Sequence, residues 1–146
     1  MAKILLLHGA NLNLLGEREP EVYGTATLAD YVATTTAAAQ KAGHTLEAFQ
    51  TNHEGELIDA IHGARGRVAA IIINPGAFTH YAWAIHDALA AFDGPVIEVH
   101  ISNPNAREPW RHTSVVAPVA IGSIAGLGMH GYELAIAAVS RVLATK

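Results

Sequence analysis

The chain has 146 residues, a length typical of one domain and too short for two, so we expect a single domain over residues 1–146. Hydrophobic residues make up 51% and charged residues 15%, which argues against a disordered chain. The net charge of −4, with scattered lysines and arginines, argues against a nucleic-acid or membrane-surface partner. The absence of cysteine excludes disulfides and thiolate metal sites.

The amino-terminal residues lack the features of a targeting segment. The apolar run of residues 4–7 is too short for a signal-peptide core or a membrane span, and no small-residue cleavage site follows it. We therefore expect a cytoplasmic protein.

The first third of the chain predicts two strands around a helix. Residues 3–8 form an apolar run typical of a buried strand, and residues 44–50 predict a second, more polar strand. Residues 27–42 have helical spacing. Thr27 is placed to cap that helix, and Asp30, three residues later, favours its amino-terminal turn.

The middle of the chain continues the alternation. Residues 54–64 predict a helix with one apolar face, and residues 68–74 are the most apolar strand. Thr79 is a candidate cap for a helix over residues 79–92. Residues 95–101 then predict a fourth strand.

The last part of the chain predicts a fifth strand within residues 115–125 and a helix over residues 131–145. Because strands alternate with helices and the central strands are almost continuously apolar, we expect a parallel sheet covered on both faces. The predicted fold class is α/β: a flavodoxin-like three-layer sandwich with a five-stranded parallel sheet in the order 2-1-3-4-5. Ligands of such sheets bind beyond the carboxyl ends of the strands.

Polar side chains gather where three of the predicted strands end. They are Asn11, Arg18 and Tyr23 after the first strand, Asn74 and His80 after the third, and Glu98, His100 and Ser102 on or after the fourth. The carboxyl ends of parallel strands meet at one edge of the sheet. The sequence therefore predicts a polar site with acid–base groups at this edge.

The connection after the first strand, residues 9–24, is longer than the two to about six residues usual for a strand-to-helix loop. If Arg18 lies near Tyr23, the cation favours the phenolate, which is the form of tyrosine that acts as a base. The alternative is a solvated charged loop that Tyr23 anchors to the surface. Spacing alone leaves both open and slightly favours the alternative.

Glu98 and His100 lie two residues apart on a strand, so their side chains share a face. A carboxylate beside an imidazole fixes its tautomer and supports its charged form. A polar pair without catalytic function fits the same spacing equally well. His80 would serve equally as a capping or packing residue, and Asp87 would ordinarily be exposed on its helix.

Other kinds of site are disfavoured. Residues 126–131 match G-x-G-x-x-G, but the chain ends before the strand and acidic residue of a dinucleotide site, so we interpret these glycines as helix–sheet packing. The nine histidines lack metal-ligand spacing, so we expect no metal. Of the three lysines, Lys3, Lys41 and Lys146, none follows a strand end, which disfavours Schiff-base chemistry.

Separated motifs recur along the chain in a fixed order. They are LHGANLNLLGEREPEVYG at 7–24, QTNHEGELID at 50–59, INPGAFTH at 73–80, EVHISN at 98–103, ARE at 106–108 with Arg111, and GLGMHGY at 126–132. In content, order and spacing they resemble the type II 3-dehydroquinate dehydratases over essentially the whole chain. Several motifs that coincide are far more specific than any one of them.

This resemblance implies a single catalytic domain, a hydro-lyase of the shikimate pathway that serves aromatic amino-acid and chorismate biosynthesis. The enzyme would convert 3-dehydroquinate to 3-dehydroshikimate by anti elimination through an enolate, with no cofactor and no Schiff base. It implies that Tyr23 is the proton acceptor and that Arg18 activates it and stabilises the transition state. Asn11 would hold the enolate through a water, and His100, supported by Glu98, would be the proton donor.

The resemblance also implies a substrate-binding set and an assembly. The binding residues would be Asn74, His80, Ile101, Ser102 and Arg111. Asp87 matches a residue that reaches the site of a neighbouring subunit, which implies a homo-oligomer, usually a dodecamer built of trimers.

The chain departs from the family's usual residues at a few positions. They are His8 for Asn, Ala10 for Pro, Asn105 for His, Pro109 and Trp110 for a Glu-aromatic pair, and His130 for Gln. None of these removes a proposed catalytic group.

An alternative function is a flavodoxin-like module that binds a flavin or another phosphate ligand. Its first loop would present Ser, Thr and Gly amides to phosphate. Here that loop carries Glu17, Glu19 and Glu21, which repel phosphate. A structural oligomer without activity is a third possibility, and the intact polar set argues against it.

Overall fold

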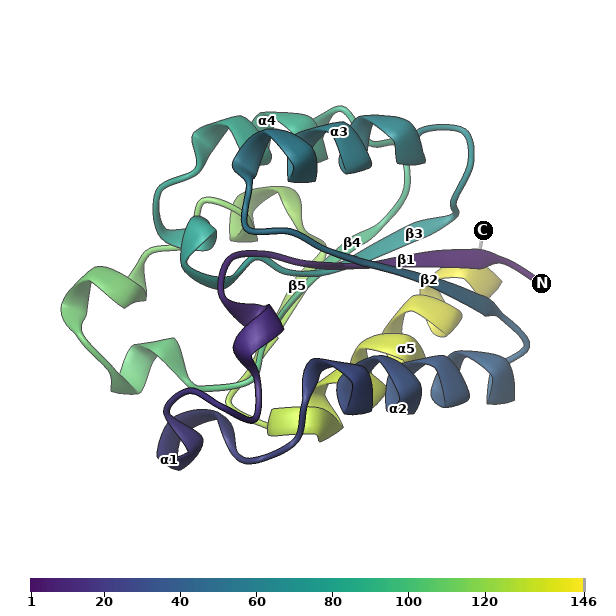
Figure 1. Cartoon of the computed structure of the whole chain (residues 1–146). Coiled ribbons are helices and arrows are strands. Elements are labelled where there is room, and N and C mark those ends of the chain that lie inside the picture. Colours follow the sequence, from purple (N-terminus) through teal and green to yellow (C-terminus); the bar gives the residue numbers. More distant parts are fainter. Residues whose placement is uncertain (146) are drawn as a thin grey trace.

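The computed structural model describes residues 1–145 and places five parallel strands in one sheet of order β2-β1-β3-β4-β5. The strands are β1 (Lys3–His8), β2 (Thr45–Gln50), β3 (Ala70–Asn74), β4 (Val96–His100) and β5 (Gly122–Ala125). Helices cover both faces, so the flavodoxin-like fold and its strand order are confirmed (Figure 1).

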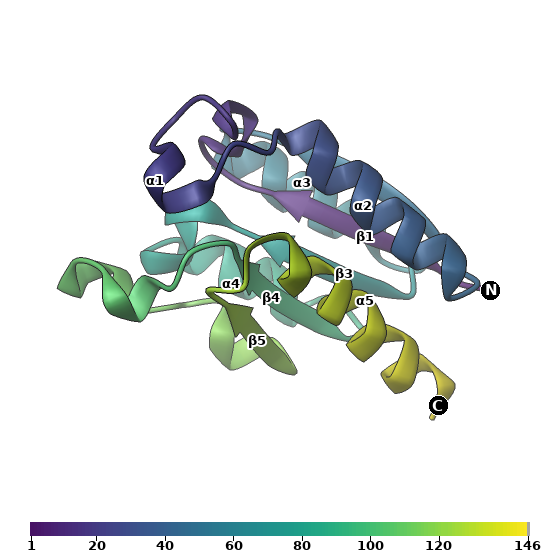
Figure 2. The same ribbon diagram turned by 90° about the horizontal axis from the view of Figure 1, so that it is seen from below.

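Four main helices form the outer layers of the sandwich. They are α2 (Leu28–Lys41), α3 (Glu54–Ala64), α4 (Trp83–Ala90) and α5 (Gly128–Ala144). Helices α2 and α5 lie side by side on one face, and α3 and α4 cover the other (Figures 1 and 2). No helix within residues 1–145 has the length and apolar character that crossing a membrane requires.

Short elements line the carboxyl edge of the sheet. They are the helix α1 (Pro20–Tyr23) and the 3-10 helices η1 (Leu12–Leu14), η2 (Gly76–His80), η3 (Pro104–Ala106), η4 (Pro109–His112) and η5 (Ala117–Val119). The amino terminus and the last turn of α5 lie at the opposite end of the molecule from α1 (Figure 1).

The cap predicted for α2 is present. The Thr27 hydroxyl accepts from the Asp30 backbone N–H at 3.2 Å, and the Asp30 carboxylate accepts from the Thr27 N–H at 2.9 Å. This reciprocal pair satisfies two backbone donors that the first turn of a helix leaves free.

The helix predicted over residues 79–92 is wrong at its start. The chain first forms η2, and α4 begins only at Trp83, after Ala82. Thr79 does not cap α4, because its hydroxyl donates to the buried Glu98 carboxylate at 2.7 Å. The last helix also begins three residues earlier than predicted, at Gly128.

The central strands are buried on both faces, and successive residues pack into different cores. Leu5 and Leu7 of β1 face α3 and α4, whereas Ile4 and Leu6 face α2 and α5. A fully buried side chain of this kind contributes about 1.5–3 kcal/mol relative to an exposed one. An exposed ion pair such as Arg67–Glu47 contributes about 0–1 kcal/mol. Packing in the two cores therefore stabilises the sheet more than surface ion pairs do.

The loops after β1 and β3 touch backbone to backbone. The N–H of Gly9 donates to the carbonyl of Asn74 at 2.8 Å. A Cβ at Gly9 would lie 2.0 Å from the Pro75 carbonyl oxygen. A Cβ at Gly76, where φ is +62°, would lie 2.7 Å from the Ala10 carbonyl oxygen. Glycine at both positions therefore allows the two loops to meet at the carboxyl edge.

We predict that Gly9→Ala lowers the free energy of unfolding by about 1–3 kcal/mol or more, because the added methyl meets rigid backbone rather than a movable side chain. Gly63→Ala is the matched control. Gly63 lies inside α3 with open space around its Cβ position, so alanine there should stabilise by roughly 0.5–1 kcal/mol. Denaturant unfolding measures both. A Gly9→Ala protein as stable as the parent would show that the loops separate freely.

Candidate active site

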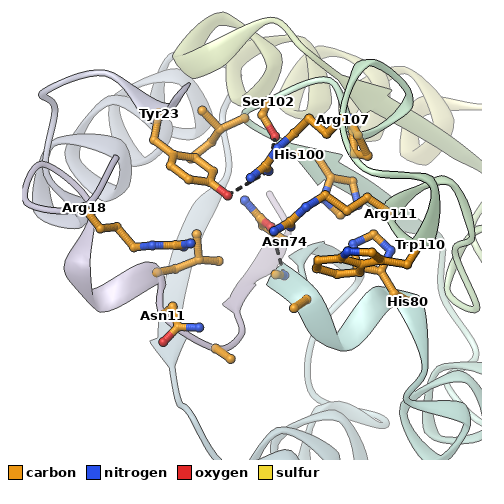
Figure 3. A pocket seen from close by; sticks show the side chains of 16 residues that line it. Asn11, Arg18, Tyr23, Asn74, His80, His100, Ser102, Arg107, Trp110 and Arg111 are labelled. Carbon is orange, nitrogen blue, oxygen red and sulfur yellow. Dashed lines mark hydrogen bonds between the residues drawn. The ribbon is translucent and has the colours of Figure 1, made fainter. Parts of the chain in front are cut away.

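A cavity of about 240 Å³ opens at the carboxyl ends of β1, β3 and β4. Its lining is Ala10, Asn11, Leu12, Arg18, Tyr23, Asn74, Gly76, Ala77, His80, His100, Ile101, Ser102, Pro104, Arg107, Trp110 and Arg111. Figure 3 shows Arg18 and Tyr23 on one side, and His80, Trp110 and Arg111 across from them. Loops that are far apart in the sequence thus enclose one polar space.

Most of the site residues predicted from the sequence lie in this lining. They are Asn11, Arg18, Tyr23, Asn74, His80, His100, Ile101, Ser102 and Arg111. Glu98 lies behind His100 and bonds to it. Asp87 does not line the cavity, because it lies on α4 with its side chain exposed. Arg107 and Trp110 also line the cavity, and neither was among the predicted site residues.

Tyr23 ends the short helix α1, where it is half-buried between two guanidinium groups. Arg107 Nη1 donates to the Tyr23 hydroxyl at 2.9 Å. The Cζ of Arg18 lies 4.8 Å from the centre of the tyrosine ring, and that of Arg107 lies 5.4 Å from it. Arg18 Nη2 instead pairs with Glu19 at 2.8 Å. The direct contact to the phenol oxygen therefore comes from Arg107.

Arg107 reaches the cavity from the loop that follows β4. Its Nη1 also donates to the Ser102 hydroxyl at 3.2 Å, which ties the loop back to the strand end. A signal for this residue was present in the sequence, since Arg107 follows Ser102 by five residues after a strand end already predicted to be polar. The loop contains Pro104 and Pro109 and has no periodicity from which a direction can be predicted.

Glu98 is a buried carboxylate, 1% exposed, that receives hydrogen bonds from four side chains. Donors are the Thr79 hydroxyl at 2.7 Å, the Ser114 hydroxyl at 2.9 and 3.0 Å, the Ser123 hydroxyl at 3.2 Å and His100 Nε2 at 2.5 Å. Burial alone would raise the pKa of Glu98. The opposing effect is larger: it comes from the hydrogen bond and charge of His100 and from the bonds of Thr79 and Ser114, so the pKa of Glu98 is lowered overall.

An ionised Glu98 accepts hydrogen bonds and cannot donate one. The Nε2 of His100 must therefore carry a proton, which leaves Nδ1 as the nitrogen that can exchange a proton with a ligand. The imidazole is held in one orientation by a partner that is itself held by three hydroxyls.

Asn74 belongs to a second buried polar group, which links it to His8 and Tyr132. Asn74 Nδ2 donates to the Tyr132 hydroxyl at 3.0 Å, and that hydroxyl lies 2.9 Å from His8 Nε2. Burial lowers the pKa of His8 to about 4 and raises that of Tyr132. Both side chains are therefore neutral near neutral pH.

His80, Trp110 and Arg111 form the opposite wall. The Cζ of Arg111 lies 4.0 Å from the Trp110 ring centre, a cation–π distance, and Arg111 Nε donates to Glu108 at 3.0 Å. His80 Nδ1 lies 2.7 Å from the Thr113 carbonyl oxygen. Burial lowers the pKa of His80, and that backbone bond only partly offsets the effect. This wall presents one permanent cation and one imidazole.

Two further predictions concern chemistry at this edge. No group of three or more His, Asp or Glu side chains in residues 1–145 is arranged to hold a metal ion. Lys3 begins β1 and Lys41 ends α2, and neither lines the cavity. Lys146 lies outside the described residues.

The sequence matches the model of one protein family, described as dehydroquinase class II, over residues 2–140. The chain belongs to the class II dehydroquinase family. It is 58% identical over 133 residues to a catabolic 3-dehydroquinase of Aspergillus clavatus, which covers 91% of this chain and 89% of that protein. It is 57% identical over 136 residues to a 3-dehydroquinate dehydratase of Bacillus licheniformis, covering 93% and 94%.

Solved structures of class II dehydroquinases have the same fold. The type II dehydroquinase from Propionibacterium acnes superposes with a TM-score of 0.93 at 45% identity, and 97% of each chain is covered. A 3-dehydroquinate dehydratase-like protein from Bifidobacterium longum gives 0.76 at 31% identity, with 99% of each chain covered. The alternative of a flavin-binding module is not favoured by these relatives.

We predict that the pH dependence of stability contains a contribution from His8. The pKa of His8 is lowered by burial from its ordinary value of 6.5 to about 4 in the folded protein. As the pH falls, the unfolded state therefore binds this proton before the folded state does. Stability that is present above about pH 6.5 is lost toward pH 4, on the order of 3 kcal/mol in total.

His8→Gln removes this titration and keeps a polar side chain. Denaturant unfolding at about pH 7.5 and about pH 4.5 should show a smaller acid loss in the variant than in the parent. Equal acid losses in the two proteins would mean that His8 is protonated in the native state.

Proposed function

We propose that this protein dehydrates 3-dehydroquinate to 3-dehydroshikimate by anti elimination through an enolate, as a step of the shikimate pathway toward aromatic amino acids. The observation that carries the proposal is the pairing of two opposite environments in one cavity. Tyr23 stands between two cations, and His100 stands against a buried anion. The names of the relatives support this substrate.

Tyr23 is the proton acceptor in this proposal. It removes a proton from the carbon next to the substrate ketone, and the acceptor must be the phenolate, because the neutral phenol is a poor base near neutral pH. Arg107 donates a hydrogen bond to the Tyr23 oxygen, which carries the negative charge of the phenolate. Arg18 lies over the tyrosine ring. Both guanidinium groups then stabilise negative charge as it moves from Tyr23 to the substrate.

Asn11 holds the enolate oxygen through a water molecule. Its backbone is in the left-handed region, with φ of 70°, and the Asn52 side chain accepts from its N–H at 2.9 Å. A non-glycine residue in this conformation costs free energy, so the Asn52 contact helps keep the Asn11 side chain at the cavity.

His100 is the proton donor. It protonates the departing hydroxyl through Nδ1, while Glu98 stabilises the charged imidazole from the other side. Base and acid come from α1 and β4, an arrangement that suits proton removal and hydroxyl loss as separate steps. No lysine, metal or cofactor takes part.

The remaining residues bind the substrate ring and its hydroxyls. They are Asn74, His80, Arg111 and the backbone of Ile101 and Ser102. Arg111, stacked on Trp110, places a fixed cation opposite Tyr23. A charged, planar donor of this kind suits an anionic group of the substrate.

We further propose a cytoplasmic homo-oligomer, a dodecamer built of trimers, in which Asp87 completes the site of a neighbouring subunit. Asp87 is exposed on α4, outside the cavity of its own chain. Tyr81, two residues before that helix, and Trp83, its first residue, are 59% and 61% exposed. Large exposed aromatic side chains mark protein–protein contacts.

The direct test is incubation of the purified protein with 3-dehydroquinate. The product contains a conjugated enone, so ultraviolet absorbance should rise with time and in proportion to enzyme. No rise above the protein-free rate would refute the proposal. A yellow, fluorescent protein would instead support the flavin-binding alternative.

We predict that Tyr23→Phe lowers turnover by roughly 10²- to 10⁴-fold and changes substrate affinity little, because it deletes the base but keeps the ring. Tyr31→Phe is the control, since Tyr31 is buried in the core away from the cavity and should tolerate the change. Steady-state kinetics gives both parameters. Turnover close to that of the parent in Tyr23→Phe would mean that another group is the base.

We predict that Arg107→Lys lowers kcat by roughly 10- to 100-fold although charge is kept, because lysine cannot reproduce the planar donor at the phenol oxygen. Arg18→Lys should also lose turnover. Arg67→Lys, in a surface pair with Glu47, should not. If Arg107→Lys retains full kcat while Arg18→Lys loses it, Arg18 alone activates Tyr23.

A further inference from the structure

A chain of three buried side chains runs from the interior of the sheet to the cavity. His8 ends β1, Asn74 ends β3 directly opposite it, and Tyr132 comes from α5. His8 and Tyr132 are 0% exposed, and Asn74 is 3% exposed. Only Asn74 lines the cavity, so anything that reaches a ligand from this chain does so through the Asn74 amide.

One backbone group fixes the direction of the hydrogen bonds among these three side chains. The N–H of Gly76 can only donate, so the Asn74 atom 3.1 Å from it is the amide oxygen. The amide nitrogen therefore faces Tyr132, and it can only donate as well.

The Tyr132 hydroxyl accepts from Asn74, which leaves its own proton for the remaining neighbour, His8 Nε2 at 2.9 Å. That nitrogen must then carry a lone pair, so the proton of the neutral ring is on Nδ1. The lowered pKa of His8 agrees with a neutral imidazole here. Within residues 1–145, His8 Nδ1 has no hydrogen-bond partner, so its N–H is unsatisfied; in the other tautomer the unsatisfied donor would be the Tyr132 hydroxyl.

These hydrogen bonds decide whether Asn74 presents a donor or an acceptor to the cavity. One amide N–H is used by Tyr132 and the amide oxygen is used by Gly76. The second N–H remains for a ligand. Asn74 therefore offers a donor, which suits an oxygen of the substrate that accepts.

If residue 8 could not accept a hydrogen bond, the Tyr132 hydroxyl proton would have only Asn74 as a possible partner among these three side chains. Either the hydroxyl proton stays unsatisfied in the core, or the amide rotates to accept it and the Gly76 N–H loses its acceptor. Both outcomes are unfavourable, and the second turns a carbonyl toward the cavity.

We propose that His8 is a positioning residue for the dehydration: by accepting the Tyr132 hydroxyl, it fixes the Asn74 amide so that an N–H donor faces the substrate. This inference rests on the proposed function for its substrate. It goes beyond that function because it assigns a role to two core residues that do not touch the ligand.

A purely structural role for His8 is the competing interpretation, because its ring also stacks on Tyr132, with centroids 5.6 Å apart and planes 13° from parallel. Two substitutions separate the roles. His8→Phe keeps an aromatic ring and loses the acceptor, whereas His8→Gln loses the ring and restores an acceptor through its side-chain oxygen.

Steady-state kinetics with 3-dehydroquinate should show KM raised about tenfold in His8→Phe, with a smaller change in kcat, because Asn74 contributes to binding in ground and transition states alike. His8→Gln should recover most of this loss. Tyr31→Phe, which removes a hydroxyl whose ring packs edge-on against Tyr132, should leave KM unchanged.

The decisive comparison repeats His8→Phe in an Asn74→Ala background. If His8 acts through Asn74, the two effects on KM are not additive and His8→Phe adds little. An undiminished effect in that background, or a normal KM in His8→Phe itself, would overturn the proposal.

A second measurement uses the parent protein and needs neither substrate nor a variant. Nitrogen NMR of the parent protein, labelled at histidine, should show His8 as the neutral tautomer protonated at Nδ1. A proton on Nε2 would reverse the hydrogen-bond chain and overturn the inference. If the NMR result holds but 3-dehydroquinate is not turned over, the proposed function fails and the orientation of Asn74 stands.

Discussion

The arrangement of the cavity depends on the buried carboxylate of Glu98. An ionised carboxylate with 1% exposure costs several kcal/mol unless donors replace its water. Here the donors come from η2, from the segment after η4, from β5 and from β4 itself. Each of these segments must close on the same point, and their closure forms the wall that holds His80 and His100. A stabilising requirement and a functional geometry thus coincide in one residue.

The two sides of the cavity have opposite charge environments, and this divides the chemistry. Guanidinium groups lie against Tyr23, where they stabilise negative charge, whereas the Glu98 carboxylate bonds to His100. A candidate base and a candidate acid held in such different surroundings within one cavity suit acid–base catalysis. The close contacts at Gly9 and Gly76 hold the β1 and β3 loops together at the carboxyl edge, where both loops line the cavity.

The sequence predicted the sheet well because strands buried on both faces leave continuous apolar runs, and the α2 cap because its partners are three residues apart. Thr79 was misassigned for the opposite reason: its partner Glu98 is 19 residues away, and a local pattern cannot reveal a tertiary bond. Arg107 was missed since its loop has no periodicity. His8 was taken as the end of an apolar strand, and only the structure shows that it meets Tyr132, 124 residues away.

The central claim is that Tyr23 removes a proton and His100 later protonates the hydroxyl, in separate steps. The most direct test is His100→Ala incubated with 3-dehydroquinate in deuterium oxide, followed by proton NMR. The variant should form little product and still place deuterium on the carbon next to the ketone, because Tyr23 and the enolate site are intact. If deuterium incorporation falls to the rate without enzyme, together with dehydration, the two groups act in one step and the account is contradicted.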